Sequence, residues 1–430
     1  MTVESLGLRM SELLSRLRSF LAGPWGFLLP LIVLAPLALG TGVYEKLFGG
    51  ANGATVQKIA VLVLLAIAAL ILGLRLPPWP IWVILGAVTV AFFVGVVIND
   101  RGNGILDSTL LRGAVGYAFP WLAFFVDWRP VSQASRALSL ALLAPFAVML
   151  GSVIHLVNLG NLFRHEYTGA VRLAAAMPPA HLAALAIFSV VGGVWLWVMG
   201  RRAGLWLALL SAAICGLTGT RGALIAAGII FGGTLVVALC YKLPYWKAGL
   251  VSGVAGVVGG SFLILPNLLK RAAQEAHGAL ALSGREEAWA YFLGRLAERP
   301  FVGYGPGGAT ELSQQSGNTT ITRSFVSPHS AYISLLVDVG WPLFLALALG
   351  IGGLLVMVVR ANVGPVRWMA GLLGAACVFY GAFDNLLNAA QSAVPFALTL
   401  AMMFAPAMTP RSIAEEVGER ALLRRDLRPR

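Results

Sequence analysis

The sequence predicts an all-α polytopic integral membrane protein with about twelve transmembrane helices and one large loop that itself contains helices. Of its 430 residues, 58% are hydrophobic and only 11% are charged, against about 25% charged residues in soluble domains. So few charges cannot cover a water-soluble surface, which excludes a soluble enzyme. The apolar runs are also continuous over roughly 17–25 residues instead of alternating, which excludes a transmembrane β-barrel.

The apolar runs define the predicted spans. Residues 25–265 contain the first nine and residues 331–408 the last three. The twelve spans cover approximately 25–43, 59–76, 79–98, 109–126, 136–158, 180–199, 203–217, 222–240, 246–265, 331–359, 366–383 and 391–408.

The two ends of the chain differ from the spans in composition. Residues 1–24 place Leu6, Met10, Leu13 and Leu17 on one helical face, with arginines elsewhere on the helix. This pattern predicts a cytoplasmic amphipathic helix that lies on the membrane surface and is not a cleavable signal peptide. Residues 409–430 form a basic tail, which we expect to be cytoplasmic.

The distribution of basic residues predicts the orientation. With both termini placed in the cytoplasm, 18 of the 31 Lys and Arg residues fall on the cytoplasmic side and 7 in the short loops of the other side. The remaining six lie in the long loop 266–330, where such counts carry little weight. The sequence therefore predicts cytoplasmic termini and an outward-facing, periplasmic long loop.

The net charge of +13 does not indicate a nucleic-acid-binding protein. This topology and the attraction to anionic lipid headgroups explain most of the excess, and no basic-aromatic binding module accompanies it. The three cysteines, Cys215, Cys240 and Cys377, lie in apolar runs without metal-ligand or disulfide spacing and are interpreted as packing residues.

The loop 266–330 has predicted structure of its own. We expect one helix over 267–282 and a second over 284–298, capped by Ser283 and Glu286 and ended by Pro300. The glycine-rich stretch 301–311 follows. Because it does not open a helix after a strand, as phosphate-binding loops do, we interpret it as a tight turn that packs the loop onto the membrane face.

Two residues outside the apolar cores are candidates for chemistry. Arg221 follows Thr218, Gly219 and Thr220 at the outer end of the eighth span. It either extends to the headgroups or offers a permanently charged fork to a lipid-linked phosphate. His329 begins the tenth span after Pro328. A helix N-terminus favours a neutral imidazole, which can accept a proton from a hydroxyl, although a lone histidine is more often structural.

These elements together resemble the O-antigen ligase family, whose members are similar to the GT-C class of membrane glycosyltransferases. His329, Ser330 and, after nine residues, Gly340 are similar to a short family motif. The TGTRG element containing Arg221, the stretch with Arg285, Trp289, Pro300, Gly303 and Gly305, and the loop between spans nine and ten also fit. Leu343 departs from the family pattern, in which a small or polar residue often ends the motif.

The resemblance implies transfer of O-antigen from undecaprenyl diphosphate to lipid A-core at the periplasmic face of the bacterial inner membrane. It implies His329 as general base, Arg221 and Arg285 on the diphosphate, inversion at the sugar, and no metal or other cofactor. Asp384 would orient His329 or hold a sugar, or would be a solvated helix-end residue. Further basic residues could assist with phosphates of either lipid: Lys58, Lys270, Arg271 and Arg323.

Three alternatives remain open. An O-antigen polymerase would share the donor lipid, but polymerases tend to have two large periplasmic loops. A protein O-oligosaccharyltransferase would share the histidine pattern. A solute transporter would belong to a different class, and the scarcity of ionisable residues within the spans, of which Asp338 is the clearest, argues against it.

Overall fold

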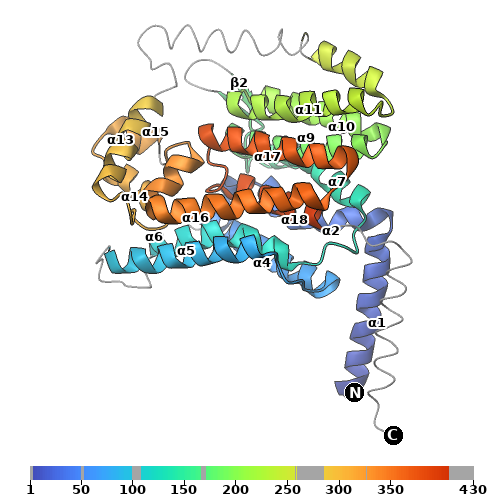
Figure 1. Cartoon of the computed structure of the whole chain (residues 1–430), viewed down its shortest axis with the longest axis horizontal. Coiled ribbons are helices and arrows are strands. Elements are labelled where there is room, and N and C mark those ends of the chain that lie inside the picture. Colours follow the sequence, from blue (N-terminus) through green and yellow to red (C-terminus); the bar gives the residue numbers. More distant parts are fainter. Residues whose placement is uncertain are drawn as a thin grey trace.

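The computed structural model describes residues 3–49, 53–98, 108–165, 171–256, 258, 285–325 and 327–405. Almost all of its regular elements are helices, as predicted (Figure 1). In chain order these are α1 Val3–Ala22, η1 Pro24–Phe27, α2 Leu28–Ala38, α3 Thr41–Phe48, α4 Gly53–Leu72, α5 Trp79–Ile98, α6 Ser108–Ala118, η4 Phe119–Phe125, α7 Gln133–Ala141, α8 Leu143–Leu156, α9 Pro179–Val198, α10 Arg202–Leu217, α11 Arg221–Cys240, α13 Arg285–Glu298, α14 Gly308–Gln315, α15 Thr319–Ser324, α16 Ala331–Ala361, α17 Gly364–Phe383 and α18 Ala390–Phe404.

The chain is a multi-pass membrane protein, but the count of twelve spans is not confirmed. Among the described residues, six helices are long and apolar enough to cross a membrane, namely α4, α5, α9, α11, α16 and α17. The count rises to eight if the α1–α2 and α7–α8 pairs, bent by 91° and 41°, are each one span.

Several of the remaining predicted spans differ from single long helices. α10 and α18 are apolar but shorter. The predicted span 109–126 is divided between α6 and the 3₁₀ helix η4, because Pro120 has no N–H to continue the α-helical ladder. In the predicted span 246–265, residues 246–256 are helical, and most of the rest lies outside the described residues.

The bundle is built around α9. Its side chains are almost all buried, from Leu182 to Trp197, and α7, α10, α11 and α18 pack against it. α16 packs between α5 on one side and α17 on the other, and α17 packs against α11. The layers therefore follow the order α5, α16, α17, α11, as Figure 1 shows from bottom to top.

α16 is not one continuous helix as predicted for 331–359. Gly340 adopts φ 70° and ψ 173°, which breaks the helix. A Cβ on Gly340 would lie 2.5 Å from the carbonyl carbon of Phe301, and Trp341 donates its N–H to the Pro300 carbonyl at 2.9 Å. Glycine is required because the loop backbone docks against the break. Residues 331–339 thus form a short half-helix.

The segment 301–311 packs against this half-helix and contains the start of α14, so the prediction of a simple turn is incomplete. Asp338 holds the segment: its Oδ1 accepts the Ala309 N–H at 2.7 Å and its Oδ2 accepts the Gly307 N–H at 2.9 Å. Behind it, α13, α14 and the half-helix share a core around Phe292, Leu312 and Val337.

Two further features concern the ends of the bundle. α1 is helical, as predicted for 1–24, and it extends from the bundle roughly across the direction of the spans (Figure 1). A two-stranded antiparallel hairpin of β1 Phe163–His165 and β2 Val171–Leu173 was not predicted. Strands of three residues are too short for an alternating pattern to identify.

Candidate functional site

His329 lies immediately before Ser330, the N-cap of α16, whose hydroxyl accepts the Ile333 N–H. Its backbone is in the left-handed region at φ 49°, a conformation unusual for a non-glycine residue and often found at functional sites. The imidazole stacks edge-to-face on Phe325, with 5.6 Å between ring centroids. A third of the side chain is exposed, at 33%. The ring is therefore oriented and remains accessible.

Asp384 is the carboxylate nearest to His329. It follows the last residue of α17, and its Oδ1 lies 4.0 Å from His329 Nδ1. The Tyr380 hydroxyl donates to Oδ2 at 3.1 Å and the Asn385 N–H donates to Oδ1 at 2.8 Å. The Ala331 N–H also donates to the Asp384 carbonyl at 3.0 Å, which joins the end of α17 to the start of α16. Asp384 is thus a buried residue and not a solvated helix end.

The charge state of Asp384 follows from its neighbours. Burial favours the neutral acid, but His329, the Asn385 amide and the Arg285 charge outweigh it and hold the pKa of this carboxyl below its usual value. An ionised carboxylate beside an imidazole stabilises the imidazolium that forms when the ring accepts a proton. At 4.0 Å the interaction is electrostatic and longer than a hydrogen bond.

Arg285 begins α13, the helix predicted over 284–298, and its charge acts on both Asp384 and Tyr380. The same helix supports the histidine, since Trp289 donates its indole N–H to the Pro328 carbonyl at 2.8 Å. The predicted cap Ser283 and the predicted helix 267–282 lie outside the described residues. α13 therefore brings Arg285 and the segment before His329 to one place.

Arg221 is the first residue of α11 and is exposed. The next residue, Gly222, is in close contact with α17: a Cβ there would lie 3.6 Å from Phe383 Cβ and 3.9 Å from the Tyr380 ring. Arg221 therefore lies at the end of α11 that meets the Asp384 end of α17. The structure thus brings His329, Asp384, Arg285 and Arg221 to the same end of the bundle.

Two residues near the site were missed by the sequence prediction. Arg172, on β2, donates its Nε–H to the Thr218 carbonyl and a terminal N–H to the Thr220 hydroxyl at 2.8 Å, so it holds the turn before Arg221. His181, on α9, is close enough for the charges of Asp384 and His329 to act on it. No local pattern identifies either residue, because both reach the site from distant elements.

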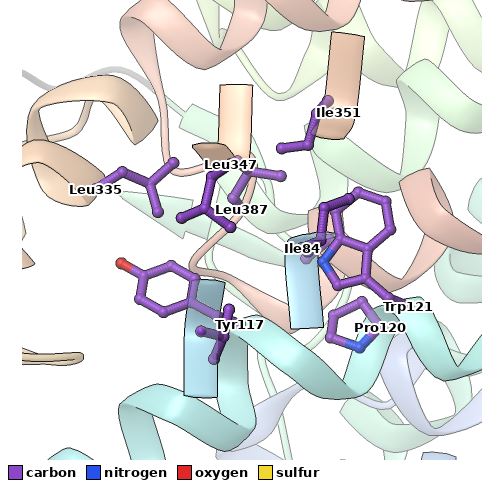
Figure 2. Close-up of a pocket in the computed structure, with 10 residues that line it drawn as sticks. Ile84, Tyr117, Pro120, Trp121, Leu335, Leu347, Ile351 and Leu387 are labelled. Atoms are coloured by element: carbon purple, nitrogen blue, oxygen red, sulfur yellow. The ribbon is translucent and has the colours of Figure 1, made fainter. Parts of the chain in front are cut away.

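Lys58 lies apart from this group. It lines a cavity of about 360 Å³ together with Arg112 on α6, Glu311 on α14 and Asn388. The Tyr117 phenol separates this polar cavity from a small apolar pocket. Figure 2 shows Tyr117 among the residues that line this apolar pocket, with its hydroxyl pointing away from Ile84, Pro120 and Trp121. That hydroxyl donates to Asp338 Oδ2 at 2.7 Å.

The other predicted supporting residues are not placed at the site. Lys270 and Arg271 lie outside the described residues. Arg323 lies on α15, but its side chain is also outside the description. Within the part of the chain that the structure describes, no three His, Cys, Asp or Glu side chains are grouped so that they could hold a metal ion. Metal independence remains a prediction.

The comparisons with known proteins bear on this end of the bundle. A sequence model of the O-antigen ligase family matches residues 203–348. No curated protein matches the chain. The matched segment runs from α10 to the residues after the break in α16 and includes Arg221, Arg285, His329 and Gly340, whereas Asp384, Arg172 and Lys58 lie outside it. Residues 203–348 are therefore similar in sequence to the O-antigen ligase family.

Proposed function

We propose that the protein is an O-antigen ligase that transfers polysaccharide from undecaprenyl diphosphate to lipid A-core at the periplasmic face of the bacterial inner membrane. The observation that carries the proposal is the pairing of His329 with Asp384 at 4.0 Å, inside the charge field of Arg285 and at the helix end where Arg221 lies. An imidazole, a carboxylate and two guanidinium groups are the groups that a metal-free transfer from a diphosphate requires.

In the proposed reaction, His329 accepts the proton of an acceptor sugar hydroxyl. The hydroxyl oxygen forms a bond to the anomeric carbon of the donor sugar as the bond from that carbon to the phosphate oxygen breaks. Undecaprenyl diphosphate leaves with the bonding electron pair, and the anomeric carbon is inverted. Asp384 stabilises the imidazolium formed in this step.

Arg221 and Arg285 are the proposed diphosphate-binding residues. The leaving diphosphate is charged in the ground state and gains charge as the bond breaks, so a guanidinium fork stabilises it in both states and more in the second. Arg172 supports this arrangement indirectly, because it fixes the backbone of Thr218 and Thr220 before Arg221.

The test of the function is reconstituted ligation. Purified protein is mixed with the lipid-linked O-antigen donor and rough lipopolysaccharide, and the product is followed by gel. Formation of a ladder on the lipopolysaccharide supports the ligase, and its survival in chelator supports metal independence. In a deletion strain, a core that bears a single repeat would indicate a polymerase instead, and an unchanged ladder would reject both enzymes.

The test of the arginines uses donor binding and ligation rate in parallel. Arg221→Ala and Arg285→Ala should weaken both, and the lysine variants should recover only part, since lysine keeps the charge and loses the fork. Arg360→Ala is the matched control, because Arg360 is exposed in the last turn of α16, far from His329. Unchanged donor binding in both alanine variants would reject the assignment.

A further inference from the structure

The polar cavity that Lys58 lines is at the same end of the bundle as His329, but on the opposite side from Arg221 and Arg285. Lys58 is in the second turn of α4 and Arg112 is near the start of α6. The opposite wall contains Ser334, one turn after the Ser330 cap, and Asn388, four residues after Asp384. The cavity therefore begins within one helical turn of the site described above.

Two cations, Lys58 and Arg112, line this cavity. Among the residues that the structure describes, neither Lys58 nor Arg112 has a hydrogen bond or an ion pair, and the Arg112 charge acts directly on Lys58. Gly116 leaves room for the amine, since a Cβ there would lie 3.2 Å from Nζ. Two like charges kept together in a partly enclosed space are stabilised when an anion binds between them.

Two carboxylates also line the cavity, and both are engaged by donors other than the two cations. Asp338 accepts the Tyr117 hydroxyl and the N–H groups of Gly307 and Ala309. Glu311 Oε1 accepts the Gln315 amide at 2.9 Å. These contacts hold the loop in place and leave Lys58 and Arg112 for a ligand.

The rest of the lining suits sugar hydroxyls. Ser334 and Asn388 are hydrogen-bonded to each other, and the buried Asn388 Oδ1 has no hydrogen-bond partner in the described part of the chain. Thr310 and Gln314 complete the polar wall. The volume of about 360 Å³ lies in the range of small-molecule sites, about 300–1,000 Å³. An anionic group carried on a sugar matches this combination of free cations, hydroxyls and amides.

The position relative to His329 indicates which substrate carries this sugar. α16 lies between α5 and α17, and α17 packs against α11. Arg221 is thus on the α17 side of His329, and Lys58 and Arg112 are on the α5 and α6 side. In an inverting displacement the acceptor hydroxyl and the leaving diphosphate lie on opposite faces of the anomeric carbon, so the two substrates approach the reacting centre from different sides.

We propose that the cavity between α4, α6, α14 and the half-helix binds a phosphate-bearing sugar of the acceptor glycolipid, through Lys58 and Arg112. The proposal rests on the proposed function for the identity of the acceptor. It assigns the donor diphosphate to Arg221 and Arg285 and the acceptor phosphate to a separate pair of cations.

The experiment compares rough lipopolysaccharide before and after removal of its phosphates. Binding to the full-length protein in detergent is measured first, so that the result does not depend on ligation. Lys58→Gln and Arg112→Gln should each weaken binding of the phosphorylated acceptor about tenfold. The two substitutions should not change binding of the dephosphorylated acceptor. The parent should bind that acceptor about as weakly as the variants bind the phosphorylated one. Arg360→Gln is the matched control: it makes the same change from arginine to glutamine away from the cavity and should leave acceptor binding unchanged.

Ligation kinetics then separate this proposal from the proposed function. The variants should raise KM for the acceptor and leave kcat and KM for the donor unchanged. A raised donor KM would mean that the cavity holds the donor, and equal losses with both acceptors would mean a structural role; either result overturns the proposal. If the parent binds the phosphorylated acceptor through Lys58 and Arg112 but makes no ligated product, the proposed function fails and the binding site stands.

Discussion

Arg136 and the Arg221–Arg285 pair lie at opposite ends of the bundle and show two uses of arginine. Arg136 is fully buried and donates to the carbonyls of Val131 and Met402, each at 2.7 Å, and to that of Ala405. It joins the start of α7 to the end of α18. Arg221 is exposed at a helix start, and Arg285 acts on a carboxylate beside an accessible histidine.

Burial and charge alone therefore do not identify a functional residue in a membrane protein. A guanidinium whose donors are taken up by main-chain carbonyls is a structural anchor, because removing it leaves those carbonyls unsatisfied. Cations that lie beside a cavity or an accessible imidazole are placed where a substrate can reach them.

The His329→Ala variant should lose ligation activity by about 10²–10⁴-fold, because it removes proton acceptance from the acceptor hydroxyl. Donor binding and the melting temperature should change little, since the ring contacts Phe325 and is partly exposed. The measurement is the ligation rate beside donor binding for folded protein. Ligation at the parental rate would make His329 a structural residue.

The Arg136→Met variant should show the opposite pattern. It leaves the carbonyls of Val131, Met402 and Ala405 without a donor. At about 1–3 kcal/mol for each buried polar group, we expect a loss of about 3–9 kcal/mol of stability. Unfolding in detergent measures this loss of stability, and Arg136→Lys should recover part of it. A stable variant with reduced donor affinity would contradict the structural interpretation.

The Gly340→Ala variant tests the junction between the loop and α16. At φ 70° an alanine is strained, and its Cβ would lie 2.5 Å from the Phe301 backbone. We expect a cost of about 1–3 kcal/mol, seen as a lower melting temperature, with reduced activity because the half-helix that begins after His329 would shift. Gly352→Ala, where a Cβ meets nothing within 4 Å, is the control.

The Asp384→Asn variant should reduce ligation at least about tenfold at neutral pH, because it removes the charge that stabilises the imidazolium. The pKa of Asp384 is lowered in the folded protein. Its contribution to stability is therefore present above the unfolded-state pKa of about 3.9 and is lost as the pH falls through the lower folded-state value. Between pH 7 and pH 3, the free energy of unfolding should fall less in the variant than in the parent.

Much of the site could be predicted locally. Arg221, Arg285 and His329 each stand at the start of an element, and the breaks in hydropathy and the flanking Pro and Gly residues indicate such starts. Asp384 was identified as a candidate, but its burial and its contact with His329 were not predictable, because the two residues are 55 positions apart. Arg172, His181 and the pairing of Lys58 with Arg112 depend on elements that meet only in the folded bundle.

Local hydropathy is enough to identify a helical membrane protein and to place most of its apolar helices, because each helix satisfies its own backbone hydrogen bonds. Local patterns also place the chemically distinctive residues at helix starts. The break of α16 at Gly340, the contacts of Asp338 with Gly307 and Ala309, and the two separate groups of cations around His329 became visible only in the folded bundle. Helix breaks, half-helices and shared cavities arise from packing between distant segments, which no local pattern encodes.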